Sequence, residues 1–214
     1  MSINHYTFNK SITGIARFLS TAFSPILMPT YGAFLVLWVS VLCVAPYGKR
    51  IAVLLVCMGI TCILPLIFMS VLRHFKLVSH LHVVEREKRH LPYIFATVCD
   101  LMAAWYLTYF HNPRWFVMFM AGAALTVLVI AIINVKWKIS AHMAGIGGVV
   151  ALIYQLHAQG LSAFNLFWLL CITILLGGAL GSARLILKRH TLLEVLAGAV
   201  VGFTCVNLIM KYLG

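Results

Sequence analysis

Three polar side chains near the end of the sequence have the types and spacing of a nucleophile and its partners. Arg184, His190 and Glu194 lie between two long apolar runs, and Glu194 is one of only four acidic residues in the chain. His190 and Glu194 are four residues apart, so on a helix their side chains share one face and can contact each other. An imidazole held by a carboxylate can act as a nucleophile. We therefore expect the chemistry of this protein at this cluster.

Two earlier groups of polar residues could complete such a site. The first contains Arg86, Lys88 and Arg89, and the second contains Ser140 and His142. A second histidine can protonate a leaving oxygen, and several cations and hydroxyl donors can hold the oxygens of a phosphoryl group. These residue types favour phosphoryl chemistry that requires neither a metal nor a cofactor.

The segments that separate these groups have the composition of membrane-spanning helices. Hydrophobic residues make up 63% of the 214 residues and charged residues only 9%, which is outside the range of soluble domains. Backbone groups inside a bilayer must be satisfied within helices. We predict an all-α polytopic membrane helix bundle of about six to seven transmembrane helices, at residues 26–46, 51–72, 93–110, 115–135, 142–158, 164–183 and 191–212. The span at 142–158 is short and rich in glycine.

The number of spans between the polar groups predicts that all three lie at one face of the membrane. Two spans separate the first group from the second, and two separate the second from the cluster at 184–194. An even number of crossings returns the chain to the same side. A single composite site is therefore predicted.

The N-terminal segment, residues 1–22, is predicted to be an amphipathic helix that lies in the membrane interface. Apolar residues recur in it at helical spacing, with polar residues between them. It lacks the continuous apolar core of a signal peptide. Residues 23–214 are predicted to form a single transmembrane domain.

Charge and cysteine content exclude several classes of partner. The net charge of +12 is carried by short connections rather than by a basic soluble module, so a nucleic acid partner is not expected, whereas anionic lipid head groups or a phosphate substrate are. The six cysteines are scattered through apolar spans without a C-x-x-C pair. They predict neither a disulfide framework nor a metal site.

The polar residues resemble the type-2 phosphatidic acid phosphatase superfamily, a family that includes lipid phosphate phosphatases and relatives of the vanadium haloperoxidases. Its third signature, S-R-x5-H-x3-D, is similar to the run containing Arg184, His190 and Glu194. Its second signature, P-S-G-H, is similar to the run containing Ser140 and His142. The resemblance extends over residues 50–212.

The chain departs from these signatures at several positions and resembles a divergent member. Ala183 stands in place of the signature serine, and Glu194 in place of the aspartate. Ile139 and Ala141 replace proline and glycine. The first signature, K-x6-R-P, is the least similar: Arg89 is separated from the proline by two residues, and histidine stands in place of the lysine.

The resemblance implies a role for each matched residue. His190 would be the nucleophile that forms a phosphohistidine, Glu194 would orient it, and His142 would be the general acid. The implied phosphate ligands are Arg184, Arg89 and Ser140, with Lys88 or Arg86 in place of the missing lysine.

The function expected is removal of phosphate from a lipid phosphate or polyprenyl diphosphate by an integral-membrane phosphatase. A phosphotransferase using the same site and a non-enzymatic anion or lipid transporter remain alternatives. Membrane prenyltransferases and CDP-alcohol transferases need several aspartates for magnesium, and Asp100 is the only aspartate in the chain. An intramembrane serine protease is disfavoured because no G-x-S-x-G-like elbow surrounds Ser140.

The distribution of basic residues favours a cytoplasmic site in a multi-pass protein of the cell's inner (plasma) membrane. Twelve of the sixteen Lys and Arg residues fall on the predicted side of the site. When the four basic residues among the predicted phosphate ligands are left out, eight Lys and Arg residues remain on this side and four on the other. Because positive charge accumulates in cytoplasmic loops, the C-terminus is expected outside.

Overall fold

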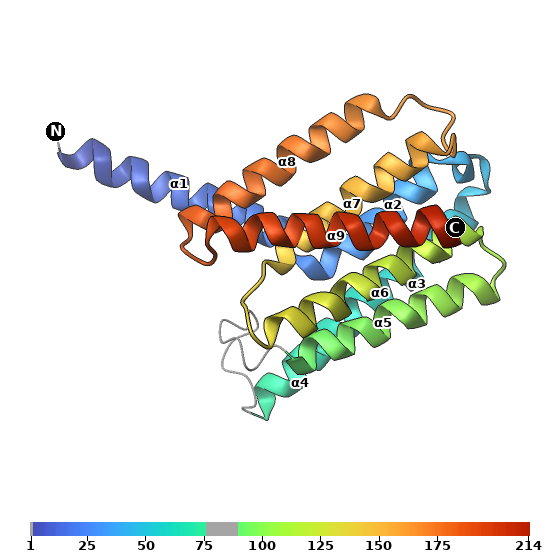
Figure 1. Cartoon of the computed structure of the whole chain (residues 1–214), viewed down its shortest axis with the longest axis horizontal. Helices are drawn as coiled ribbons and strands as arrows, with labels where there is room; N and C mark the ends of the chain where they lie inside the picture. Colours follow the sequence, from blue (N-terminus) through green and yellow to red (C-terminus); the bar gives the residue numbers. More distant parts are fainter. Residues whose placement is uncertain (1, 76–89) are drawn as a thin grey trace.

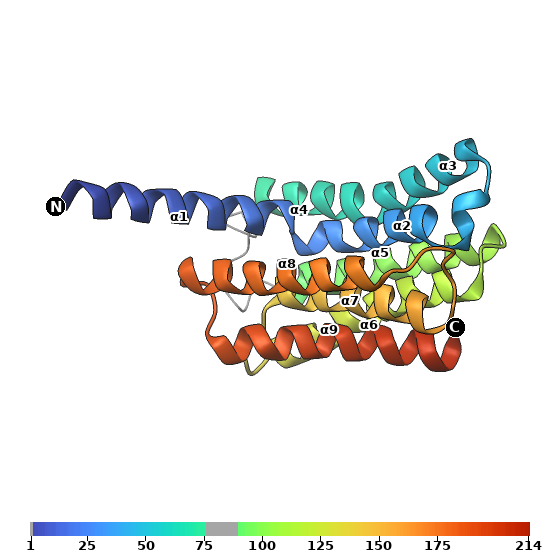
Figure 2. The same cartoon turned by 90° about the horizontal axis from the view of Figure 1, so that it is seen from above.

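The helices run roughly along one common axis (Figures 1 and 2). The computed structural model describes residues 2–75 and 90–214, with side chains described from residue 10 onward. In chain order the helical elements are α1 (Ser2–Ala22), η1 (Pro25–Leu27), α2 (Met28–Val39), η2 (Val41–Val44), α3 (Tyr47–Met58), η3 (Gly59–Ile63), α4 (Leu64–His74), α5 (His90–Tyr109), α6 (Arg114–Asn134), α7 (Ala141–Ala158), α8 (Phe167–Ile186) and α9 (Leu192–Leu213).

Seven helical stretches within the described residues are long and apolar enough to cross a membrane, which confirms the predicted all-α membrane bundle. They are Lys10–Val39, Tyr47–His74, His90–Tyr109, Arg114–Asn134, Ala141–Ala158, Phe167–Ile186 and Leu192–Leu213. The short, glycine-rich fifth stretch is among them. It is also the most buried of the seven, so its glycines serve packing inside the bundle.

The first span differs from its predicted range of 26–46 at both ends, since the apolar helical stretch runs from Lys10 to Val39 and so includes much of α1. The α-helix ends at Val39, and a 3-10 turn follows. The reason is local, because the Ser40 hydroxyl donates to the Val36 carbonyl and accepts a bond from the Leu42 backbone N–H at 3.1 Å. The Ser40 hydroxyl therefore bonds to backbone groups that could otherwise continue the helix.

The N-terminal helix α1 confirms the predicted helix and adds a tertiary contact. It joins α2 through Ser24, whose backbone is extended, and Pro25, which opens η1. The part of α1 nearest this junction packs against α8, and Ala16 and Ser20 on it are buried. Its placement in a membrane interface stays a prediction.

The most extensive contact between two helices is that between α7 and α9, where two glycines let the backbones touch. A Cβ atom on Gly202 would overlap the backbone carbonyl of Ala144, and one on Gly198 would lie 2.5 Å from the carbonyl oxygen of Ser140. Small residues spaced four apart are the usual means of close helix approach in membranes. The start of α7 is thereby fixed against the first half of α9.

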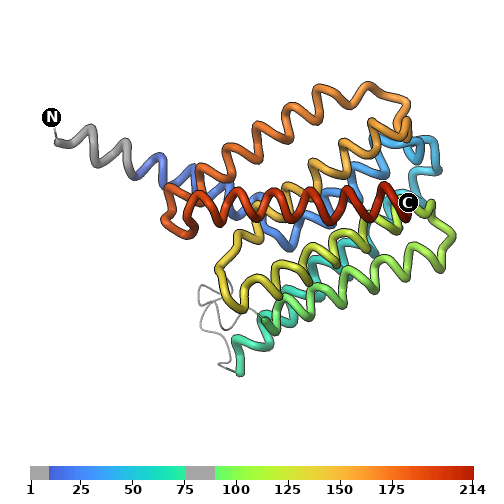
Figure 3. Tube along the Cα trace, in the orientation of Figure 1, coloured from blue at the N-terminus to red at the C-terminus, as the bar shows by residue number. Residues whose placement is uncertain are grey.

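The helix ends that carry the predicted site gather at one end of the bundle (Figure 3). The end of α4, the start of α5, the α6–α7 connection and the α8–α9 turn all lie there, and the C-terminus lies at the other end. The parity prediction is thus confirmed for the second and third polar groups. Arg86, Lys88 and Arg89 of the first group lie outside the described residues.

We expect a methyl group at Gly202 to force α7 and α9 apart. Gly202→Ala should lower the free energy of unfolding by about 1–3 kcal/mol, the usual cost of overpacking a core. Gly178 on α8 is the matched control, because nothing lies within 4 Å of a Cβ atom placed there. Gly178→Ala should leave stability unchanged or slightly higher. Thermal unfolding in detergent measures both, and equal melting temperatures would contradict the close contact.

Candidate active site

The turn between α8 and α9 is short and held by defined hydrogen bonds. Helix α8 ends with the backbone N–H of Arg189 bonded to the Arg184 carbonyl and that of Lys188 bonded to the Leu185 carbonyl. This is a Schellman motif, whose C′ residue adopts the left-handed conformation. Lys188 occupies that position with φ of 51°. The chain therefore reverses direction immediately before His190.

Helix α9 begins with a capping box directly after His190. The Thr191 hydroxyl accepts from the Glu194 backbone N–H at 3.5 Å, and a Glu194 carboxylate oxygen accepts from the Thr191 backbone N–H at 3.4 Å. Such reciprocal bonds satisfy donors that a helix start leaves open. His190 is thus held between a helix end and a helix start, and little freedom remains at its backbone.

His190 and Glu194 form the predicted pair. The Nδ1 atom of His190 lies 2.7 Å from a carboxylate oxygen of Glu194. Since an ionised carboxylate only accepts hydrogen bonds, Nδ1 carries the proton and Nε2 keeps the lone pair. The glutamate side chain, which is longer than the aspartate of the signature, therefore reaches the ring. The His190 side chain is only 2% exposed, so the pair is shielded from water.

The electrostatic surroundings keep the His190 ring neutral. Its pKa is lowered from the ordinary 6.5 to about 4, first by burial and further by the positive charges of Arg184 and Lys138. The hydrogen bond and the negative charge of Glu194 act in the opposite direction but do not outweigh burial. At neutral pH the ring is an uncharged imidazole with a free electron pair, which is the form that can attack phosphorus.

The α6–α7 connection is tied to this turn by two bonds. The Lys138 ammonium donates to the Arg189 carbonyl at 2.7 Å, and the Ser140 backbone N–H donates to the Glu194 carbonyl at 3.2 Å. Ser140 is fully buried, and its hydroxyl has no hydrogen-bond partner among the described residues. The Ser140 N–H is thus used in holding α7 to α9. The predicted contact of Ser140 with phosphate stays a prediction.

His142 and Arg184 are joined by a residue of α1 that the sequence reasoning missed. The His142 ring nitrogen Nε2 lies 3.0 Å from the Ser20 carbonyl oxygen, and a guanidinium nitrogen of Arg184 donates to the Ser20 hydroxyl at 3.2 Å. Ser20 is itself 7% exposed. It therefore positions two predicted site residues from different helices. The sequence feature that could have indicated Ser20 is its place on the polar face of the amphipathic N-terminal segment.

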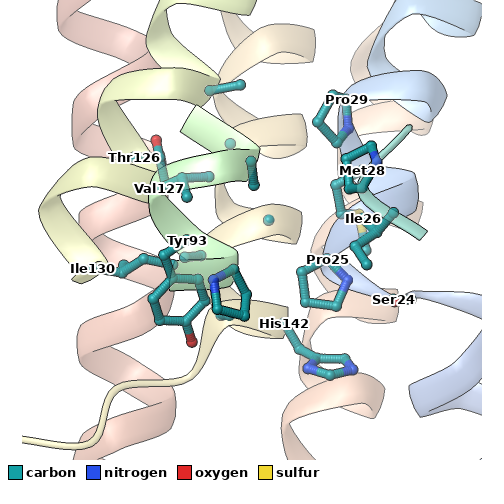
Figure 4. Close-up of a pocket in the computed structure, with 18 of the residues that line it drawn as sticks. Ser24, Pro25, Ile26, Met28, Pro29, Tyr93, Thr126, Val127, Ile130 and His142 are labelled. Carbon is teal, nitrogen blue, oxygen red and sulfur yellow. The ribbon is translucent and has the colours of Figure 1, made fainter. Parts of the chain in front are cut away.

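These residues lie along one end of a cavity of about 460 Å³, a volume typical of ligand sites. His142 and His190 both line it, whereas Glu194 and Ser140 do not. Figure 4 shows the two facing walls, with Tyr93, Thr126, Val127 and Ile130 opposite the segment from Ser24 to Pro29 and with His142 between the walls at one end. The cavity continues between the helices as a mainly apolar space.

Four cations line the same end of the cavity, and we call this group the cationic end: Arg17, Lys138, Arg184 and Arg189. Of these four residues, only Arg184 is predicted from the sequence to belong to the site. Glu194 lies behind His190 and does not line the cavity. The cationic end therefore presents donors and positive charge to a bound anion, with a neutral histidine beside them.

Comparisons with protein-family models, curated proteins and solved structures find no match to this chain. Within the described ranges, no three side chains of His, Cys, Asp or Glu come together as a possible metal site.

The lowered pKa of His190 predicts a dependence of stability on pH. Between pH 6.5 and about 4 the unfolded chain binds a proton at this residue that the folded protein does not, so stability falls as the pH is lowered through this window and the loss levels off below it. Thermal unfolding at several pH values should show a smaller fall for His190→Asn. An identical fall in both proteins would contradict a neutral, buried His190.

Proposed function

We propose that this protein is an integral-membrane phosphatase that removes phosphate from a lipid phosphate or polyprenyl diphosphate through a phosphohistidine intermediate. The observation that carries the proposal is the bond of 2.7 Å between His190 Nδ1 and Glu194, at a cavity whose one end is cationic and whose remaining walls are mainly apolar. Such a cavity suits an amphiphile with an anionic head. The resemblance to the type-2 phosphatidic acid phosphatase superfamily agrees with this assignment.

The first chemical step forms a bond between His190 and phosphorus. The cationic end holds the phosphoryl oxygens and offsets the negative charge that spreads over them. His190 Nε2 attacks phosphorus, and the bond from phosphorus to the leaving oxygen breaks. Glu194 stabilises the positive charge that develops on the ring. His142 gives a proton to the leaving oxygen, and the dephosphorylated lipid departs.

The second step returns the enzyme to its starting state. A water molecule attacks phosphorus, the bond between nitrogen and phosphorus breaks, and inorganic phosphate forms. His142, which lost its proton in the first step, takes one from this water. An alcohol in place of water would give a phosphotransferase by the same route.

The contacts of Ser20 support His142 and Arg184 in these roles. A residue that bonds to both keeps the proton donor and the phosphate ligand at a fixed separation, which favours attack in a defined geometry. Both contacts come from α1, so we assign α1 to the site and not only to the membrane surface.

We expect the purified protein to release phosphate from phosphatidate or a polyprenyl diphosphate in detergent containing EDTA. His190→Ala should lower the rate by about 10³-fold or more, because it removes the nucleophile. His157→Ala is the matched control, since His157 is an exposed residue in the last turn of α7, at the other end of the bundle. It should retain full activity.

Two results would separate this proposal from its alternatives. Unchanged phosphate release by a folded His190→Ala protein would exclude the phosphohistidine route. Tight binding of the lipid phosphate by the wild type, without phosphate release or transfer to an added alcohol, would favour a transporter or lipid-binding protein, because the cationic end can recognise an anion without any reaction.

We further propose that the cationic end faces the cytoplasm of a cell with the protein in its plasma membrane. The end of the bundle with the C-terminus holds Lys49, Arg50, Arg114 and Lys211, and the remaining twelve Lys and Arg residues belong to the opposite side in the sequence. By the positive-inside rule, a reporter fused after Gly214 should be read outside the cytoplasm. A cytoplasmic signal would overturn this orientation.

A further inference from the structure

The cavity contains a carboxyl group far from the cationic end. Asp100 lies on α5 ten residues after His90, which corresponds to about 15 Å along the helix axis. It lines the cavity and is only 3% exposed. The proposed phosphatase chemistry uses groups at the cationic end and assigns no role to this residue.

The carboxyl group of Asp100 has no hydrogen bond or ion pair with any residue for which side chains are described. Two hydroxyl groups that line the same cavity give their protons to their own helices: Thr126 donates to the Gly122 carbonyl, and Thr61 donates to the Cys57 carbonyl and pairs with Thr30 at 3.2 Å. A buried polar group without a partner costs free energy. An ionisable residue inside a membrane therefore points to a functional site.

Two threonine side chains from other elements also line the cavity. Thr126 comes from α6, and Thr61 comes from η3, a π-helical turn that ends two residues before Pro65. Such turns are frequent at functional sites. Each hydroxyl donates to its own helix, so its oxygen can still accept a bond. Together with Asp100 they place hydrogen-bonding atoms at a depth where a lipid has only hydrocarbon.

The missing partner is therefore best supplied by the ligand, and its chemistry is restricted. A hydroxyl group can donate to a carboxylate, or it can accept from a carboxylic acid and donate its own proton to the Thr126 oxygen, so it fits Asp100 in either protonation state. An amine would also pair with the carboxylate, but the four cations at the cationic end repel a positively charged ligand. The long apolar walls select a hydrocarbon chain.

The length of the cavity agrees with such a chain. Phe119 and Val206 also line it, and they lie fifteen residues before the end of α6 and fourteen after the start of α9. These separations correspond to about 20 Å along each helix. Asp100 therefore lies partway along the cavity, and a chain bound there passes it.

We propose that the cavity selects anionic lipids whose chain carries a hydroxyl group near its middle, and that Asp100 and Thr126 hold this hydroxyl. The inference rests on the proposed function only in placing the phosphate head at the cationic end. It adds a second point of recognition, which would distinguish hydroxylated chains from plain ones.

The test compares two long-chain alkyl phosphonates, one with a single hydroxyl near mid-chain and one without. Phosphonates are used because their carbon–phosphorus bond is not hydrolysed, so binding to the full-length protein in detergent is measured apart from phosphate release. The wild type should bind the hydroxylated phosphonate about tenfold more tightly, the effect of one hydrogen bond to a carboxyl group. Asp100→Leu should remove this preference.

Two further variants keep the test decisive if Asp100→Leu does not fold. Asp100→Asn retains hydrogen-bonding atoms and should keep most of the preference, and Thr126→Val should reduce it. Thr97→Val is the control on the same helix, because Thr97 does not line the cavity and donates to the Tyr93 carbonyl. It should bind both phosphonates as the wild type does.

Equal affinity of the wild type for both phosphonates would overturn the proposal, and so would an undiminished preference in a folded Asp100→Leu protein. A preference that depends on Asp100 would support it even in a protein that releases no phosphate. That last result would reject the phosphatase assignment alone, so the two proposals fail separately.

Discussion

The backbone contact between α7 and α9 is the constraint on which the geometry of the candidate site depends. His142 follows the first residue of α7, and His190 lies directly before Thr191, the N-cap residue of α9. The distance between the two histidines is therefore set by how closely the two helices approach. In lipid, helices gain little from burying apolar side chains against each other, and close packing of small residues takes that role. Gly198 and Gly202 meet this requirement by bringing backbone against backbone. The bond from Ser140 to the Glu194 carbonyl then fixes the register of the two helices.

Much of the fold was predictable because a bilayer leaves few alternatives. Hydropathy alone gave seven spans, and counting them placed Ser140 and His142 at the end of the bundle that holds His190. The pair of His190 and Glu194 was predictable because the two residues are only four apart in the sequence. The structure forms the contact across the capping box that starts α9, and not along one helical turn as the spacing suggested. The early end of α2 at Ser40 was missed, since a single hydroxyl that bonds to its own helix hardly changes the hydropathy of a long apolar run.

The contacts of Ser20 were not predictable for the opposite reason. Ser20 is 122 residues from His142 and 164 from Arg184 in the sequence, and no local pattern encodes so distant an approach. The same holds for Arg17 and Lys138 at the cationic end. Their residue types are those of ordinary interfacial cations, and only the path of α1 back along α8 brings Arg17 to the cavity. The apolar depth of the cavity likewise depends on the packing of several helices.

The position of Glu194 resolves a conflict that any phosphate site with a histidine nucleophile must meet. A carboxylate is needed to hold the ring and to stabilise its positive charge, yet a carboxylate in contact with phosphate would repel it. Here the imidazole ring separates the two charges. Glu194 bonds to Nδ1 and does not line the cavity, whereas His190 does. A phosphate at the cationic end would therefore meet cations and a neutral ring first. The capping box strengthens the arrangement, because the same carboxylate oxygen also bonds to the start of α9 and cannot turn toward the cavity without breaking both contacts.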